Sequence, residues 1–111
     1  MRIDRYSFVY FVIDGKTYEH EIKIINEKIV FWKDHGLSEK DVRDVAEAKP
    51  KPSVLIIGTG SQGVVDVTRE IKDKLKRASI RLVIEQTGKA CSLYNELSKN
   101  ENVAAVLHST C

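Results

Sequence analysis

A glycine-rich string after an apolar run carries the most specific chemical signal in this sequence. Residues 58–63 read Gly-Thr-Gly-Ser-Gln-Gly, a G-x-G-x-x-G pattern that directly follows Val54-Leu55-Ile56-Ile57. In dinucleotide-binding proteins such glycines let the backbone approach a pyrophosphate, and the N-terminus of the next helix stabilises the negative charge. The string predicts either a site for a nucleotide or small anion, or simply a tight turn between a strand and a helix.

The candidate ligand-binding residues follow the ends of two expected strands. Thr59 and Ser61 carry hydroxyl groups that can bind an anion or cap a helix. Glu85 lies 22 residues after Gly63, where an acid can bind ribose hydroxyls or act as an acid or base, and it is otherwise a solvated carboxylate at a strand end. The candidate set is Gly58, Thr59, Gly60, Ser61, Glu85 and Thr87.

Cys91 is the candidate nucleophile if the protein is an enzyme. It is expected near a helix start, where the helix dipole and Lys89 lower the pKa of a thiol. Free cysteines are more often buried, and no histidine is adjacent in sequence to serve as a base, so a packed thiol is favoured. His108 and Cys111 offer two metal ligands, but no close His or Cys cluster completes a site. We therefore expect no metal and no cofactor.

Trp32 and His35 are the candidates for an interaction surface. A core position is favoured for Trp32, although indole side chains also border binding surfaces. His20 is expected to point inward from a strand, and His35 to lie in a loop. No Ser, His and Asp arrangement is visible in the sequence, so whether the protein is an enzyme stays open.

Antiparallel strands are expected in the first half of the chain. Tyr6 to Ile13 is rich in aromatic and β-branched residues, and Asp14-Gly15 favours a tight hairpin turn. The expected return strand, Thr17 to Ile25, alternates between apolar and charged residues, as when one sheet face is wet. A third short strand is predicted over Ile29 to Lys33.

Strands and helices alternate in the remainder of the chain. Ser38-Glu39-Lys40-Asp41 resembles a capping box, and Lys49-Pro50-Lys51-Pro52 ends the helix that it begins. Strand-helix-strand connections place strands parallel, so the later strands should end along one edge. The predicted helices are Ser38 to about Ala48, about Val65 to Ala78, and one that opens at Thr87 and is ended by Asn100 to Asn102. The predicted strands end at Gly58, Glu85 and His108.

Length and composition predict one globular domain over residues 1–111. The chain has 42% hydrophobic and 31% charged residues and a net charge of +2, which gives no reason to expect a nucleic acid or a membrane as partner. Its apolar runs are far shorter than the roughly 20 residues that span a bilayer. Two cysteines are too few for a disulfide scaffold, and the N-terminus lacks a signal-peptide pattern, so the cytoplasm is expected.

Several short strings together resemble a known family of small domains. They are Leu55-Ile56-Ile57-Gly58-Thr59-Gly60, Ile84-Glu85 with Thr87, Ala90-Cys91, Tyr94-Asn95 with Leu97, Val103-Ala104-Ala105 and Leu107-His108, together with Asp14-Gly15, Tyr18, Trp32, His35 and Asp41 in the first half. In this order and spacing they resemble the adipogenesis-associated-domain family of unknown function, whose relatives include a mitochondrial complex I assembly factor.

The resemblance implies an α/β fold with three layers: a central mixed sheet, flanking helices and an additional β-hairpin. It places Gly63 outside the family pattern, which weakens the dinucleotide interpretation, and it brings no catalytic residue or cofactor. The leading hypothesis is therefore a non-enzymatic protein-binding or assembly module in the cytoplasm. The alternative is a small-anion or nucleotide-binding protein or enzyme that uses the Gly58–Gly63 turn. Self-association is expected, because small sheets often cover an exposed hairpin edge with a second copy.

Overall fold

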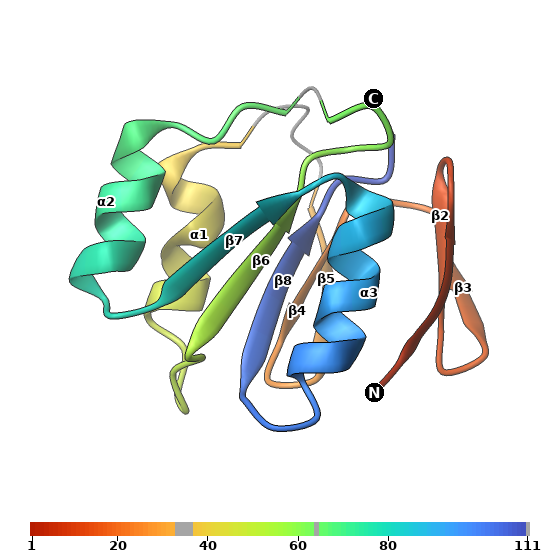
Figure 1. Cartoon of the computed structure of the whole chain (residues 1–111), viewed down its shortest axis with the longest axis horizontal. Coiled ribbons are helices and arrows are strands. Elements are labelled where there is room, and N and C mark those ends of the chain that lie inside the picture. The colour runs from red at the N-terminus through yellow and green to blue at the C-terminus, as the bar shows by residue number, and fades with distance from the viewer. Residues whose placement is uncertain (33–36, 64, 111) are drawn as a thin grey trace.

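A five-stranded mixed sheet forms the centre of the protein (Figure 1). The computed structural model describes residues 1–32, 37–63 and 65–110. In sheet order the strands are β5 (Lys28–Phe31), β4 (Ile22–Ile25), β8 (Val103–Leu107), β6 (Val54–Gly58) and β7 (Arg81–Glu85). Helices α1 (Glu39–Ala46) and α2 (Arg69–Arg77) pack on one face, while α3 (Thr87–Leu97) and a three-stranded sheet lie beside each other on the other face. The predicted three-layer α/β fold is confirmed.

The three later strands run parallel, as predicted, because each is joined to the next through a helix. All five residues of β6 are buried, which fits a continuous apolar run covered on both faces. In the register of the sheet Gly58 pairs with Glu85 on one side and with Leu107 on the other. The strand ends named in the sequence therefore meet at one edge.

The additional sheet consists of β1 (Ile3–Ser7), β2 (Tyr10–Ile13) and β3 (Lys16–Tyr18). The predicted turn at Asp14-Gly15 joins β2 to β3, with both residues at positive φ. A second turn, at Phe8 and Val9, was not predicted, and it divides the expected Tyr6 to Ile13 strand between β1 and β2.

The additional sheet is attached to α3 through one amide side chain. Asn95 of α3 accepts from the Ile3 amide at 2.8 Å and donates to the Ile3 carbonyl at 2.7 Å. The side chain thus satisfies both backbone groups of Ile3 on the side of β1 where no described strand pairs with it.

The predicted return strand from Thr17 to Ile25 is wrong as one element. Its first part is β3, which pairs with β2, and its last part is β4, which lies in the central sheet between β5 and β8. Apolar and polar residues alternate across the boundary between β3 and β4 because both sheets contribute side chains to the same core. Phe11 of β2 belongs to this core together with Ile22 and Ile24 of β4. His20 lies at the crossover and is exposed, not inward, with its ring 5.3 Å from that of Phe31.

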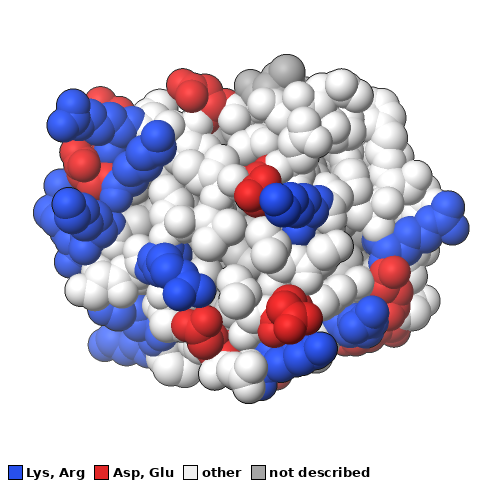
Figure 2. Space-filling model, viewed as in Figure 1, with Lys and Arg blue, Asp and Glu red and all other residues white. Residues whose placement is uncertain are grey.

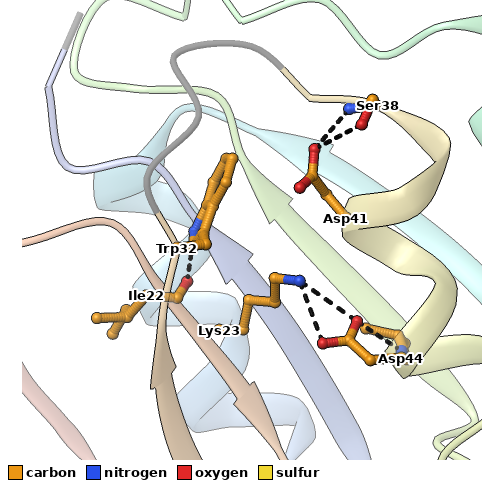
Figure 3. Close-up of polar contacts among 7 residues, drawn as sticks. Ile22, Lys23, Trp32, Ser38, Asp41 and Asp44 are labelled. Atoms are coloured by element: carbon orange, nitrogen blue, oxygen red, sulfur yellow. Dashed lines mark hydrogen bonds and ion pairs between the residues drawn. The ribbon is translucent and has the colours of Figure 1, made fainter.

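The capping box before α1 is present. The Asp41 carboxylate accepts from the Ser38 amide at 2.8 Å and from the Ser38 hydroxyl at 2.9 Å (Figure 3). Lys23 of β4 is almost fully buried beneath this helix, and its Nζ lies 3.1 Å from Asp44 Oδ2. This ion pair joins α1 to the central sheet.

The predicted start of the second helix at Val65 is wrong by four residues. Thr68 is the N-cap of α2, and its hydroxyl accepts from the Ile71 amide at 3.4 Å. Val65 and Val67 precede the helix and pack on its core side, so their apolar character extends the helical stripe beyond the helix itself. The predicted start of α3 at Thr87 and the predicted strand Arg81–Glu85 are confirmed, but α3 ends at Leu97, before the predicted stop at Asn100 to Asn102.

Candidate functional site

The carboxyl ends of β6, β7 and β8 form the rim that the sequence nominated. Thr59 follows β6, and both its amide and its hydroxyl donate to the Glu85 carbonyl, at 2.9 and 3.1 Å. The His108 amide donates to the Gly58 carbonyl at 3.0 Å. The glycine turn, Glu85 and the end of β8 are thus in direct contact, as the parallel strands predicted.

Thr87 holds this rim together from the first residue of α3. Its side chain is fully buried; its hydroxyl donates to the His108 carbonyl at 2.6 Å and accepts from the Gly60 amide at 2.9 Å. The Thr87 amide in turn donates to the Gly60 carbonyl at 3.1 Å. The donors that an anion would need at Thr87 and Gly60 are therefore engaged within the fold.

Two glycines of the motif have structural reasons to be glycine. A Cβ at Gly58 would lie 2.9 Å from Thr87 Oγ1 and 3.0 Å from a Leu107 methyl group, so no side chain fits between the strand ends. Gly60 has a φ of +102°, a conformation that L side chains rarely adopt. The interpretation of the motif as a tight turn therefore explains the glycine at position 58 and the glycine at position 60.

The geometry of a dinucleotide fingerprint is not formed. In that fold a helix starts within the motif and directs its first amides at the pyrophosphate, whereas α2 begins at Arg69, six residues after Gly63. The helix that starts at the rim is α3, which begins at Thr87. Binding of another ligand by Thr59, half-buried Ser61 and Glu85 stays a prediction.

A surface pocket of about 360 Å³ lies beside the rim and carries mixed charge. It is lined by residues of the glycine turn, the segment before α2, α2 itself and the end of β7, among them Thr59, Gly63, Asp66, Lys72 and Glu85. The Glu85 carboxylate also pairs with Lys89 Nζ at 3.5 Å, and both side chains are partly exposed. Acids and lysines offset each other here, so the pocket has no strong preference for an anion.

A larger pocket of about 600 Å³ lies at the other end of the parallel strands, near the start of β8. It is lined by the end of α3, the start of β8, the β4–β5 turn and the segment between α1 and β6, including Asn26, Lys51, Tyr94, Lys99 and Asn102. Pocket size alone would therefore place a ligand site away from the glycine-rich motif. We give the rim more weight for chemistry, because carboxyl ends of parallel strands are where α/β sheets bind ligands.

A buried polar cluster behind the rim was missed in the sequence. His108 is fully buried, with Nδ1 3.8 Å from Glu21 Oε1, and the Ser109 hydroxyl donates to the same oxygen at 3.0 Å. The available signal in the sequence is a histidine directly after a buried strand. Among residues 1–32, 37–63 and 65–110 no cluster of three or more His, Cys, Asp or Glu side chains could hold a metal ion.

Trp32 lies in the core, the position that the sequence favoured, with 7% of its surface exposed. Its Nε1 donates to the Ile22 carbonyl at 3.2 Å (Figure 3). Its ring lies 6.1 Å from that of His108. His35 lies outside the described residues. The interaction surface assigned to these two residues stays a prediction.

The Cys91 thiol is buried in α3, as the packed-thiol interpretation predicted. Burial raises its pKa from 9.0 to about 12, because the thiolate would lose its hydration in an apolar core. The effect is opposite to the lowering expected from the helix dipole and Lys89. Desolvation therefore dominates, and Cys91 lacks the thiolate character of a nucleophile.

We expect the Cys91 thiol to react with Ellman's reagent at pH 8 at least about 100-fold more slowly in the folded protein than in urea, because a raised pKa depletes the thiolate. The measurement uses the Cys111→Ser variant, so that Cys91 is the one thiol followed. Cys91→Ala in the same background is the blank. Rates within a factor of ten of each other would contradict the burial of this thiol.

No helix of the described residues is both long and apolar enough to cross a membrane.

Comparison with known proteins agrees with the resemblance seen in the sequence. The zebrafish (Danio rerio) protein named NADH dehydrogenase [ubiquinone] 1 alpha subcomplex assembly factor 3 is 27% identical over 98 residues, which cover 86% of this chain and 56% of the relative. The chain thus spans about half the length of the curated relative it matches.

Solved structures share the fold at low sequence identity. A conserved hypothetical protein from Pyrococcus horikoshii OT3 superposes with a TM-score of 0.88 at 24% identity, covering 100% of both chains. A protein described as an outer membrane protein from Bartonella henselae gives 0.84 at 25% identity, covering 98% of this chain and 94% of the other. A Mth938-like domain from Bordetella pertussis gives 0.73 at 16% identity, covering 97% and 85%.

The family described as protein of unknown function (DUF498/DUF598) matches residues 3–108, nearly the whole chain. The order and spacing of the short strings had indicated such a family, and that recognition is confirmed. The chain belongs to the DUF498/DUF598 family.

Proposed function

We propose that this protein is a non-enzymatic, protein-binding module that assists the assembly of other proteins, and that it contacts its partner through the turn between β1 and β2. This turn, the Phe8–Val9 tip, consists of Phe8 and Val9. The observation that carries the proposal is that the tip exposes 56% of Phe8 and 43% of Val9. Exposed aromatic side chains are typical anchors of protein interfaces.

Val9 adopts a backbone conformation that a β-branched residue avoids. Its φ is +87°, a region in which glycine or asparagine is usual. Strain of this kind costs about 1–3 kcal/mol and is concentrated at functional positions. An exposed valine there gains little from burial in this fold, which supports a role in binding.

The tip is held firmly against the rim. The Val9 amide donates to the Ser109 carbonyl at 2.9 Å, and the Tyr6 hydroxyl donates to the same carbonyl at 2.9 Å. The Tyr6 ring also packs against that of buried Phe11, with centroids 5.1 Å apart. A fixed tip loses little conformational entropy when a partner binds, so Phe8 is suited to insert into an apolar pocket of another protein.

Further observations support a protein partner. The zebrafish relative is named as an assembly factor, and the rim donors at Gly60 and Thr87 are engaged internally, which weakens an enzymatic interpretation. Figure 2 shows Lys and Arg side chains gathered at the α2 side of the viewed face with acids among them, and the net charge is only +2, which offers little to a nucleic acid. Cys91 as a buried free thiol fits action in the cytoplasm.

A photo-crosslinking amino acid at position 8 tests the proposal. Irradiation in cells is expected to give one dominant protein adduct, which is then identified by mass spectrometry and purified. With purified proteins, Phe8→Ser should raise the Kd at least tenfold, because an aromatic anchor is lost. Phe8→Leu should bind more tightly than Phe8→Ser.

Phe31→Ser is the matched control, since Phe31 is 51% exposed but belongs to β5 of the central sheet and not to the tip. It is expected to bind the partner like the parent protein. Equal loss of binding in Phe8→Ser and Phe31→Ser, or an unchanged Kd in Phe8→Ser with an intact circular dichroism spectrum, would overturn the assignment to the tip.

A further inference from the structure

Strand β5 is an apolar edge of the central sheet. Among the described residues it pairs only with β4, and 48% of Val30 and 51% of Phe31 is exposed. Natural edge strands are usually protected by a proline, a bulge or several charges, whereas β5 has regular pairing and one charged residue, Lys28, at its start. The opposite edge, β7, carries charged residues at both ends and exposes Ile84 by only 36%.

The outward hydrogen-bonding groups of β5 can be assigned from the register. The Trp32 amide donates to the Glu21 carbonyl at 3.1 Å, so these residues form a hydrogen-bonded pair. Such pairs alternate along an antiparallel ladder, and the next is Val30 with Lys23. Ile29 and Phe31 therefore direct their N–H and C=O groups away from β4, where no described strand receives them.

These groups are complementary to those of a second β5. If two copies pair antiparallel with Val30 opposite Val30, then Ile29 of each copy lies opposite Phe31 of the other. All the outward groups are then satisfied by four hydrogen bonds, two in each of the two symmetric pairs. Registers centred on Ile29 or on Phe31 satisfy half as many of these groups within β5, so the register centred on Val30 is favoured.

The side chains agree with this register. The two Val30 side chains meet in a non-hydrogen-bonded pair, in which side chains approach closest, and Phe31 lies beside Ile29 of the other copy on the opposite face. Lys28 of one copy does not face Lys28 of the other. Both exposed apolar side chains of β5 become covered without like charges being brought together.

We propose that two copies of this chain associate through β5 around a two-fold axis at Val30, and so join their central sheets into one ten-stranded sheet. The proposal is independent of the Phe8–Val9 tip, which leaves that tip free for another protein. It extends the expected self-association to a defined strand, register and symmetry.

Paired charge variants at residue 30 test the symmetry. The parent protein is expected to sediment as a dimer of the 12.6 kDa chain at high micromolar concentration. Val30→Lys and Val30→Glu should each raise the dimer Kd at least tenfold, because a residue on the two-fold axis faces its own charge. Mixing the two variants should restore a heterodimer, since opposite charges then meet. Ile84→Lys, at the other edge, is the control and should remain dimeric.

A cysteine at the axis tests the register. Val30→Cys in the Cys111→Ser background should form an intermolecular disulfide on mild oxidation, whereas Lys28→Cys should not. A parent chain that stays monomeric at millimolar concentration overturns the proposal. So does a dimer that survives Val30→Lys, or mixed charge variants that fail to associate. If the dimer forms as expected but no partner is crosslinked at the tip, the result counts against the proposed function alone.

Discussion

Replacing Thr87 by valine is expected to lower the free energy of unfolding by about 3–5 kcal/mol. The two side chains have nearly the same shape, so the change removes the hydroxyl and little else. The Gly60 amide and the His108 carbonyl both lose their hydrogen bond to that hydroxyl in a fully buried position. Unsatisfied buried groups cost about 1–3 kcal/mol each. Urea unfolding followed by circular dichroism measures the loss.

Thr87→Ser is the matched control, because it keeps the hydroxyl and removes one methyl group. We expect it to cost about 1 kcal/mol. If valine and serine destabilise the protein equally, the hydrogen bonds of Thr87 do not hold the rim. The result also limits what Thr87 variants can say about function, since loss of binding would follow from loss of the rim. Glu85→Gln is the better probe of ligand binding, because within the described part of the chain the ion pair of the Glu85 carboxylate is with Lys89, which is largely exposed.

Replacing Phe11 by alanine is expected to cost about 3–5 kcal/mol and to loosen the additional sheet. Phe11 lies on β2, its ring is fully buried, and it packs in the core that the additional sheet shares with Ile22 and Ile24 of β4. The cavity left by the ring removes contacts between two layers, and neighbouring strands can close it only in part. Urea unfolding and near-ultraviolet circular dichroism measure the two effects.

Phe8→Ala is the matched control for Phe11→Ala. Both aromatic residues belong to the same short segment, but Phe8 is 56% exposed at the tip. Its replacement should change the free energy of unfolding by less than about 1 kcal/mol, since exposed side chains contribute little to stability. A loss as large as that of Phe11→Ala would mean that the tip is part of the core and not a free contact surface.

The predicted elements that proved correct have strong local signals. The strands that end at Gly58 and Glu85 are short apolar runs, and α1 begins at a capping box whose partners are three residues apart. Their parallel order follows from the intervening helices, which is why the contact between the glycine turn and Glu85 could be predicted.

The errors arose where two elements share one hydrophobic pattern. Thr17 to Ile25 keeps its alternation across the crossover from β3 to β4, because both strands face the same core. Val65 and Val67 extend the apolar stripe of α2 although the helix starts at Arg69. Hydrophobic periodicity reports which side chains are buried, but it does not report where one element ends.

The sequence by itself determined the α/β class, the parallel strand ends at the rim and the family, because these depend on local periodicity, short connections and recurring strings. Tertiary structure alone decided which side chains are buried and which polar groups already have a hydrogen-bond partner within the fold. Thr87 and Gly60 satisfy each other across 27 residues, His108 is buried beside Glu21, and Phe8 is exposed while Phe11 is not. Each of these outcomes depends on contacts between segments that are distant in the chain. The residue type specifies what a group can bind, but only the fold determines which residue lies within hydrogen-bond distance of it.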